Sequence, residues 1–267
     1  MPWVNPAEPT SPLCFQTAVA PQISRKTSTK KYRTTFLVSN RASLSFSWLL
    51  MMPHPVIAID GTAASGKSTF SRKLAQRLGY VYVNTGAMYR GVTWYLQEKQ
   101  TPLKDIDAVT REIANAGVES WLENGELAFR IAGLDPLPHV REARINEAVS
   151  LVAQVPAVRS VLVAEQQGLA AHAPLVMEGR DIGTAVFPQT PYKFYIDANA
   201  EVRAQRRQLQ GETDVIQKRD VLDQQRAVSP LTCAADAFRL DSSYASVDEL
   251  LVIALGHLRA RGLTIPA

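Results

Sequence analysis

Apolar positions along the chain predict strands and helices in alternation. Residues 56–60 form a short apolar run between Pro55 and Gly61, which is typical of a strand buried on both faces. After a glycine-rich turn, apolar residues recur at i, i+4 and i+8, as in a helix with one face packed on a sheet; they are Phe70, Leu74 and Leu78. Gly79 suits the C-terminus of this helix, because glycine readily adopts positive φ.

Later segments extend the same pattern to the end of the chain. Further strands are predicted, with helical stretches between them, at residues 80–84, 175–178, 192–198 and 237–241. Such alternation is typical of a parallel α/β sheet flanked by helices. The last helix has a clear start, since Ser246 and Glu249 form a capping-box pattern before an apolar run, and Gly262 marks its end.

One stretch breaks the alternation. Residues 118–123 and 126–131 flank Asn124 and Gly125, a pair that tolerates positive φ and favours a two-residue hairpin turn. The second segment alternates apolar and other side chains at period two. We therefore expect a small antiparallel subdomain inserted into the α/β core.

Composition and charge exclude several classes of partner. The 267 residues are 46% hydrophobic and 20% charged, as in a globular protein with one main domain. The net charge of +4 comes from the first 50 residues, which hold six basic side chains and one acid, so the rest of the chain sums to −1. Nucleic acid is therefore not an expected partner. No apolar run approaches the roughly 18–20 residues needed to cross a bilayer, so we expect a soluble protein with no membrane partner.

Cysteines and histidines carry no chemistry in this interpretation. The chain has two distant cysteines and four scattered histidines. They predict neither a disulfide framework nor a metal site, and they fit a reducing compartment.

Residues 1–52 are left outside the predicted fold, as a disordered tail or a wrongly assigned start. The first 50 residues contain 13 Ser or Thr, several prolines and one acid, a composition that buries little apolar surface. An organelle transit peptide is one interpretation; the other is a start codon assigned too far upstream, with Met51 or Met52 as the true start. The second is favoured, because the first strand begins just after these methionines.

Residues 61–68 match the pattern G-x-x-x-x-G-K-S/T between a predicted strand and a predicted helix, which is the context that a P-loop requires. In such a loop, backbone N–H groups bind phosphates, Lys67 reaches the β and γ oxygens, and Ser68 binds Mg²⁺. The predicted ATP-binding residues are Gly61, Thr62, Ala63, Ala64, Ser65, Gly66, Lys67, Ser68 and Thr69. The loop identifies the phosphate donor but not the acceptor.

Two further features suit phosphoryl transfer. Glu178 ends a predicted buried strand, where an acid could lie beside Mg²⁺; a solvated strand end is the alternative. Three arginines share one face of a predicted helix, namely Arg203, Arg206 and Arg207. Three more cations follow, namely Lys218, Arg219 and Arg226. A lone arginine usually marks a solvated face, but as a set these side chains match phosphate oxygens and indicate a lid over residues 203–226.

The order of these motifs resembles bacterial cytidylate kinases, which belong to the nucleoside monophosphate kinases with a P-loop. Beyond the P-loop, the matching blocks are NTGAMYR at 84–90, EGRDIGT at 178–184, VFP at 186–188, RD at 219–220 and QRAVSP at 225–230. The resemblance covers residues 55–262, and the TGAMYR and GRDIGT blocks are far more specific than the P-loop itself.

The resemblance also implies a division of the domain, 53–262. The core is expected at 53–84, 171–202 and 227–262, with a nucleoside-monophosphate-binding insertion at 85–170 and a lid at 203–226. This lid is short, since only residues 208–218 separate Arg207 from Arg219.

For function, the resemblance implies transfer of the γ-phosphoryl group of ATP, with Mg²⁺, to CMP or dCMP. The implied catalytic residues are Lys67, Arg180 and Arg226. The residues implied to hold the acceptor phosphate are Thr85, Arg90, Arg180 and Arg226. Those implied to recognise cytosine are Ser150, Arg159 and Asp181, and those implied to contact the ribose are Arg219 and Asp223. A cytoplasmic monomer with only small-molecule nucleotides as partners is expected.

Two alternatives stay open. One is a different P-loop kinase, acting on another nucleoside monophosphate or on a non-nucleotide acceptor. The other is a regulatory module that binds a nucleotide without turnover; the intact Lys67, Ser68 and arginine set argues against it.

Overall fold

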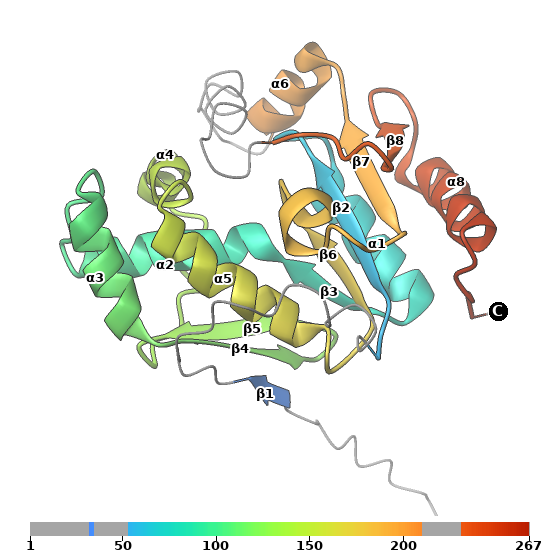
Figure 1. The fold of residues 1–267 in the computed structure, drawn as a ribbon. Coiled ribbons are helices and arrows are strands. Elements are labelled where there is room, and N and C mark those ends of the chain that lie inside the picture. The colour runs from blue at the N-terminus through green and yellow to red at the C-terminus, as the bar shows by residue number, and fades with distance from the viewer. Residues whose placement is uncertain (1–31, 35–52, 210–230, 267) are drawn as a thin grey trace, which may run out of the picture.

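The structure is a computed structural model that describes residues 53–209 and 231–266, together with the backbone of residues 32–34. Its strands form one eight-stranded sheet in the order β1-β4-β5-β3-β6-β2-β7-β8 (Figure 1). The described strands are β1 (Tyr32–Thr34), β2 (Val56–Gly61), β3 (Val81–Asn84), β4 (Val118–Glu123), β5 (Glu126–Ile131), β6 (Leu175–Glu178), β7 (Lys193–Asp197) and β8 (Phe238–Asp241). The described helices are α1 (Lys67–Leu78), α2 (Thr85–Glu98), α3 (Ile106–Ala116), α4 (Ala143–Val152), α5 (Pro156–Leu169), the short π-helix η2 (Ile182–Val186), α6 (Ala200–Leu209) and α8 (Val247–Ala260).

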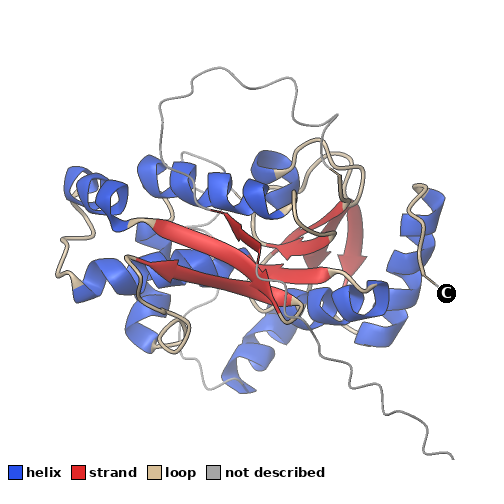
Figure 2. Ribbon diagram, turned by 90° about the horizontal axis from the view of Figure 1, so that it is seen from below, coloured by secondary structure: helices blue, strands red, loops and turns tan. Residues whose placement is uncertain are grey.

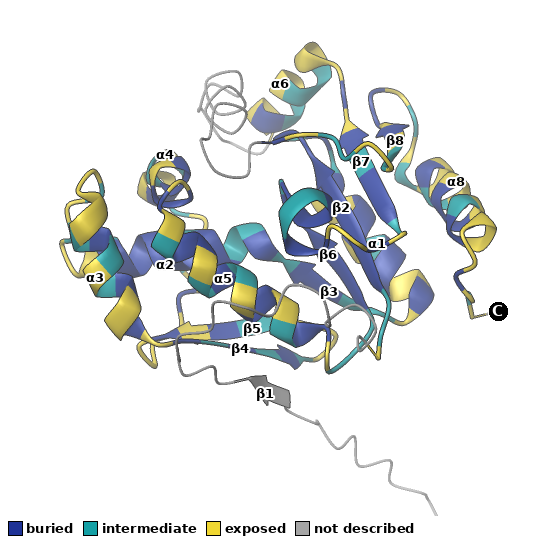
Figure 3. Ribbon diagram, viewed as in Figure 1, coloured by how far each residue is buried: buried dark blue, intermediate teal, exposed yellow. Residues whose placement is uncertain are grey.

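The centre of the sheet is parallel and is covered by helices on both faces (Figure 2). Along β2, Ile57 and Ile59 pack in one core with α1 and α8, whereas Val56 and Ala58 pack in another core with the end of α5. This alternation follows from the period of two in a strand buried on both faces. Figure 3 shows the same arrangement as buried strands beneath helices whose outer faces are exposed. The predicted parallel α/β sheet flanked by helices is confirmed.

The predicted hairpin is present with its predicted bounds. β4 and β5 pair antiparallel, and the turn residues Asn124 and Gly125 have φ angles of 52° and 79°. The hairpin has its own core with α2, α3, α4 and α5. It also joins the central sheet, because β5 pairs parallel with β3 through Tyr82 and Glu126. The insertion therefore extends the main sheet at one side.

The expectation that residues 1–52 lie outside the fold is wrong for Tyr32–Thr34. These three residues form β1, which pairs antiparallel with β4. The physical reason is that the outer side of β4 offers unpaired N–H and C=O groups, which an extended segment of almost any composition can satisfy. Residues 1–31 and 35–52 lie outside the described ranges.

Helix ends follow the sequence closely. Gly79 caps α1 with a φ of 68°, and its N–H donates to the carbonyl groups of the last turn. Ser246 and Glu249 form the predicted capping box of α8. Gly262 has a φ of 85° just after that helix, as expected of a residue that ends it.

Among the described residues, no single helix is long and apolar enough to cross a membrane. The bent pair α4 and α5, which meet at 100°, passes that test only when the two are taken together.

Candidate active site

The P-loop joins β2 to α1 at the carboxyl edge of the parallel sheet. β2 ends at Gly61 and α1 begins at Lys67, so the predicted order of strand, loop and helix is confirmed. Gly61 has a φ of 147°, and a Cβ there would lie 1.9 Å from the carbonyl oxygen of Ile196 on the neighbouring strand. Only glycine fits this position. Among the residues that the structure describes, no side chain caps α1 at Gly66, and the N-terminus of this helix therefore suits an anion.

The ammonium group of Lys67 lies inside this loop. It donates to the carbonyl oxygen of Thr62 and, at 3.5 Å, to Ser65 Oγ. Ser65 Oγ donates to the same carbonyl at 3.0 Å. Thr62 Oγ1 donates to Asp197 Oδ1 at the end of β7, at 2.6 Å. The loop is thus held by its own polar groups around a central cation.

Glu178 ends β6 beside the P-loop. Its Oε1 accepts hydrogen bonds from Ser68 Oγ and Tyr82 Oη, both at 2.8 Å, and the residue is 4% exposed. Its Oε2 is buried, with no hydrogen-bond partner among the described residues. Burial and the nearby Glu178 carboxylate raise the pKa of Tyr82 well above its usual value, so the phenol stays a proton donor.

These groups fit a divalent cation. A buried carboxylate oxygen without a partner is costly unless a cation or donor reaches it. Ser68 Oγ, whose proton is directed at Glu178 Oε1, keeps its lone pairs for a metal. Mg²⁺ prefers oxygen ligands and usually takes only one or two from the protein, the others coming from water and phosphate. Ser68 and Glu178 therefore suit a magnesium ion that also binds a nucleotide.

One cavity of about 1620 Å³ extends from the P-loop to a second group of polar side chains. Pockets for a single small molecule usually have roughly 300–1,000 Å³, so this one has room for two ligands. The predicted site residues in its wall are Ala63, Ala64, Ser65, Gly66, Lys67, Ser68, Thr69, Thr85, Arg90, Ser150, Arg159, Glu178, Arg180, Asp181, Arg206 and Arg207. Gly61 and Thr62 are not in the wall; they connect the loop to β2.

The second group of polar side chains begins at the N-terminus of α2. Thr85 is its first residue, and Thr85 Oγ1 donates to the carbonyl oxygen of Glu178 at 2.8 Å. Arg90 lies further along α2, where its Nε donates to Asn146 Oδ1 on α4 at 3.1 Å. Arg180 follows β6. A hydroxyl and a guanidinium group from α2, and a second guanidinium group from the segment after β6, thus line the same cavity as the P-loop, which suits a second phosphate.

Arg159 on α5 and Asp181 form a buried ion pair between Nη2 and Oδ2, with side chains only 5% and 6% exposed. The Arg159 guanidinium lies 5.8 Å from the centre of the Tyr89 ring. Arg159 Nη1 is buried and has no hydrogen-bond partner within the described ranges. Ser150 on α4 lines the same cavity. A buried donor and a carboxylate side by side can read the edge of a polar, planar ligand.

The arginines of α6 lie close to the P-loop. Arg203 Nη1 donates to the carbonyl oxygen of Ala63 at 3.3 Å. Arg206 Nη1 donates to Ser242 Oγ at 3.1 Å, and this hydroxyl donates to the carbonyl oxygen of Ser65 at 2.7 Å. The other residues predicted for the lid and the ribose lie outside the described ranges: Lys218, Arg219, Asp223 and Arg226.

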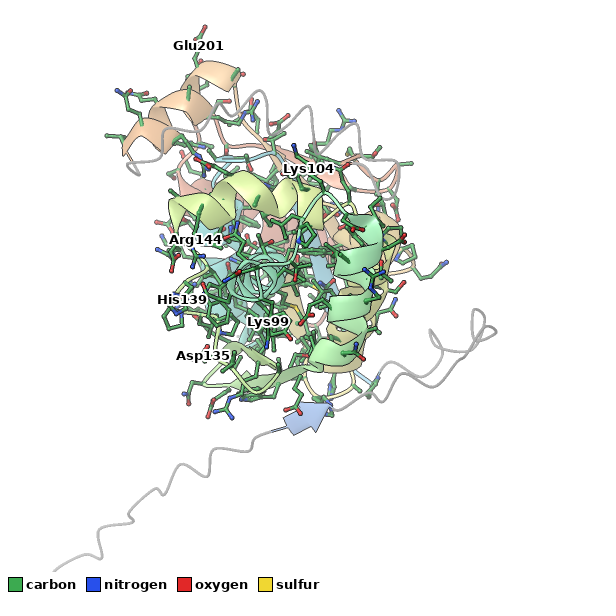
Figure 4. All side chains as sticks on the ribbon, turned by 90° about the vertical axis from the view of Figure 1, so that its left-hand side faces the viewer. Lys99, Lys104, Asp135, His139, Arg144 and Glu201 are labelled. Carbon is green, nitrogen blue, oxygen red and sulfur yellow. The ribbon has the colours of Figure 1, made fainter. Side chains whose placement is uncertain are left out.

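The segment of residues 137–144 forms part of the cavity wall, and surface contacts hold it against α2. The His139 ring stacks on Trp94 with a centroid separation of 4.8 Å. Arg144 donates to Glu142 at 2.7 Å and to Glu98 at 2.8 Å, and Figure 4 shows His139 and Arg144 on the same side of the insertion. Hydrogen bonds from Arg144 and His139 lower the pKa of Glu142. Within this segment, the residues that line the cavity include Leu137, Val140 and Arg141.

Sequence reasoning missed Asp60 and Tyr82. Asp60 is 4% exposed at the end of β2; its Oδ1 accepts from Ile182 N and its Oδ2 from Gly183 N, both at 2.8 Å. Burial raises the pKa of Asp60 to about 6. An acid at the end of an apolar strand was visible in the sequence, but its partners lie more than a hundred residues away.

Two anion sites that face one cavity on a parallel sheet are what a phosphotransferase needs in order to hold a donor and an acceptor together. The fold and the site thus define a P-loop phosphotransferase. Comparison with protein families narrows this class, because residues 57–259 match the family model described as cytidylate kinase. The chain belongs to the cytidylate kinase family, and the resemblance noted in the sequence is confirmed.

Individual relatives agree. The chain is 40% identical over 212 residues to a cytidylate kinase of Desulforamulus reducens, covering 75% of this chain and 95% of that protein. It is 39% identical over 207 residues to a cytidylate kinase of Geobacillus sp., covering 73% and 92%. A bifunctional pantoate ligase/cytidylate kinase of Synechococcus sp. is 39% identical over 219 residues, which are 76% of this chain and 42% of that protein.

Among solved structures, the shikimate kinase of Acinetobacter baumannii in complex with shikimate has a TM-score of 0.44 and 13% identity. The match covers 81% of this chain and 99% of that one.

Proposed function

We propose that this protein transfers the γ-phosphoryl group of ATP to CMP or dCMP, giving ADP and CDP or dCDP. The observation that carries the proposal is that one cavity contains both the P-loop and the separate group of Thr85, Arg90 and Arg180. Donor and acceptor phosphates bound at these two places would meet within the same enclosed space, where positioning lowers the barrier to transfer.

At the donor end, the backbone of residues 61–69 and the N-terminus of α1 bind the ATP phosphates. Lys67 exchanges the carbonyl oxygen of Thr62 for the β and γ oxygens. Ser68 and Glu178 would hold Mg²⁺, which would supply positive charge to neutralise the charge that develops on the phosphates. The α6 arginines, already bonded to the loop and to Ser242, add positive charge near the migrating group.

At the acceptor end, Thr85, Arg90 and Arg180 bind the α-phosphate, with Arg226 as a further ligand. A hydroxyl and guanidinium groups suit a dianion, because planar guanidinium forks match phosphate oxygens. Arg219 and Asp223 are proposed to contact the ribose on the family resemblance alone.

Base recognition is assigned to Ser150, Arg159 and Asp181. Arg159 Nη1 is a buried donor that lacks an acceptor in the described part of the chain, and a cytosine oxygen or ring nitrogen supplies one. Asp181 accepts from the exocyclic amine. Uracil, which has a carbonyl in place of the amine, leaves these groups mispaired, and such polar discrimination is strong.

The chemistry needs positioning and charge neutralisation more than proton transfer. Phosphoryl transfer is largely dissociative, so no dedicated general base is assigned. Asp181 is committed to its ion pair with Arg159 and to the base. Closure of the lid over both nucleotides excludes water and limits ATP hydrolysis. A cytoplasmic monomer remains our prediction.

A coupled ADP-release assay with the full chain tests the function. ATP is held constant and CMP, dCMP, UMP, AMP and shikimate are offered in turn. Release that depends on CMP or dCMP supports the proposal; release with another acceptor indicates a different P-loop kinase. ATP binding without acceptor-dependent release indicates a regulatory module.

The Lys67→Ala variant tests the mechanism in the same assay. We expect turnover to be abolished, because the ammonium group that reaches the transferring phosphoryl group is removed. Lys73→Ala is the matched control: Lys73 lies on the same helix, exposed and paired with Asp248, outside the cavity. Turnover of Lys67→Ala close to that of Lys73→Ala would contradict the assignment.

A further inference from the structure

Asp60 lies where the hydrogen bonds between β2 and β6 end. The paired register of these strands runs to Ile59 and Glu178, and Gly179 N then donates to the carbonyl oxygen of Ile59 at 2.9 Å. Beyond this point the chain leaves β6 and continues through Arg180 and Asp181 into η2. The carboxylate of Asp60 takes over from the backbone and accepts the N–H groups of Ile182 and Gly183, both at 2.8 Å.

The turn held by Asp60 is tightly packed. A Cβ at Gly183 would lie 3.3 Å from Asp60 Oδ2 and 3.1 Å from Lys193 Cδ. A Cβ at Gly179 would lie 2.8 Å from Thr85 Oγ1. The Ile182 side chain is fully buried in the core beneath. A side chain at Gly179 would force its neighbours to shift, and one at Gly183 would be tight, so the turn has little freedom while the Asp60 contacts persist.

Two charged groups act on the Asp60 carboxylate in opposite directions. The carboxylate faces Asp181, which repels it, and Lys67, which attracts it. The Lys193 stem also packs on the turn, but its ammonium group is committed to Asp236 at 2.9 Å. A buried carboxylate close to another carboxylate is costly unless its hydrogen bonds are made. The N–H groups of Ile182 and Gly183 make these hydrogen bonds and so stabilise the carboxylate, and the same bonds fix the turn.

We propose that Asp60 is a positioning residue for the acceptor site. Its carboxylate sets the turn that carries Arg180 and Asp181 at a fixed place relative to the P-loop, which begins at the next residue. Asp60 itself touches neither nucleotide. This inference rests on the proposed function, in which Arg180 binds the acceptor phosphate and Asp181 reads the base.

The inference predicts which parameters change when the carboxylate is altered. In Asp60→Asn, one of the two N–H groups faces an amide NH₂ group in place of an oxygen, so the turn shifts. Displacements on the order of 1 Å can cost up to about 100-fold in rate. The carboxylate attracts Lys67, but the shape of the P-loop depends on Gly61 and on contacts of Thr62 and Ser65.

The experiment measures kcat and KM for CMP and UMP, and Kd for ATP, in the wild type and in Asp60→Asn. We expect the ratio of kcat/KM for CMP over UMP to fall about tenfold or more, with KM for CMP raised, while Kd for ATP changes less than about twofold. An unchanged CMP/UMP ratio would overturn the inference. So would loss of ATP binding in a folded variant.

Glu165→Gln is the matched control. Glu165 is also a buried carboxylate that accepts a backbone N–H, from Ser120 at 3.0 Å, but it lies away from the cavity wall. Loss of stability alone would affect both variants, whereas only Asp60→Asn is expected to change the CMP/UMP ratio. An equal fall of the ratio in both variants would refute a positioning role.

The wild type provides a second measurement in case Asp60→Asn does not fold. Since the pKa of Asp60 is about 6, lowering the pH from 7.5 to 5.5 protonates most of this carboxylate, and the protonated form has one acceptor fewer. The acceptor phosphate is the same in CMP and UMP, so its titration cancels in the ratio of the two kcat/KM values. A ratio that falls on acidification supports the inference, and a constant ratio overturns it. A wild type without any preference for CMP at pH 7.5 would instead refute the proposed function.

Discussion

Breaking the buried ion pair between Arg159 and Asp181 should be costly to both stability and specificity. The two side chains are 5% and 6% exposed, so Arg159→Met leaves the Asp181 carboxylate buried without its cation. Removal of one partner of such a pair typically costs about 3–5 kcal/mol. The nearby Asp60 carboxylate adds repulsion, because the two acids already raise each other's energy. We therefore expect Arg159→Met to lower the free energy of unfolding by about 3–5 kcal/mol.

Urea unfolding of four proteins measures this effect: the wild type, Arg159→Met, Asp181→Asn and the double variant. In the double variant the uncompensated carboxylate is gone, so its loss of stability should be smaller than the sum of the two single losses. We expect a coupling energy of about 2–3 kcal/mol, near the upper end for residues in contact. A domain stable by roughly 5–15 kcal/mol retains enough folded protein for this measurement.

Two results would refute the reasoning. One is a loss below about 1 kcal/mol in Arg159→Met, which would mean that water or another cation reaches Asp181. The other is an additive cycle, which would mean that the two groups do not interact. In the folded variant, the CMP/UMP ratio of kcat/KM should also fall, on the order of 100-fold, because a buried donor to the base is lost.

Three further outcomes are expected. Relative to Asp60→Asn, the wild type should lose roughly 2 kcal/mol of its free energy of unfolding between pH 4 and pH 7, measured by urea unfolding. The folded pKa of about 6 lies above the unfolded value of 3.8, so the native state binds the proton more tightly and this stabilisation is lost as the pH rises. An equal or opposite slope would contradict this sign. Tyr82→Phe removes one donor to Glu178 Oε1 and should raise the Mg²⁺ concentration for half-maximal activity several-fold, with KM for CMP unchanged; a shift in KM for CMP alone would argue against it. Ser246→Ala should cost about 1 kcal/mol of stability through loss of the α8 capping box, with kinetics unchanged; a loss below about 0.3 kcal/mol would contradict it.

Local patterns were sufficient for much of the fold. The strand at 56–60, the helix starting at Lys67 and the hairpin turn at Asn124 and Gly125 all follow from a few neighbouring residues. Apolar period, glycine conformation and capping are short-range effects, so a single sequence contains them. The pairing of Tyr32–Thr34 with β4 could not be predicted in this way, because strand pairing depends on which edge is available in the folded sheet.

In the candidate site, too, the sequence predicted the contiguous motif, whereas contacts between distant residues needed the structure. The P-loop was predicted with its phosphate role, because loop, lysine and helix N-terminus are contiguous in the sequence. The placement of Glu178 beside Ser68, left as one of two alternatives by the sequence, follows from β6 lying next to β2. Asp60 had no assigned role until its distant partners were known.

By itself, the sequence determined the strands, the helix ends, the phosphate loop and the family to which the chain belongs. The tertiary structure alone decided that Arg90, Arg180 and Arg159 reach one cavity, and that Asp60 holds the turn next to Asp181. Local conformation is set by neighbours within a few residues, whereas convergence of side chains from α2, α5 and β6 depends on how these elements pack, which spacing along the chain does not encode.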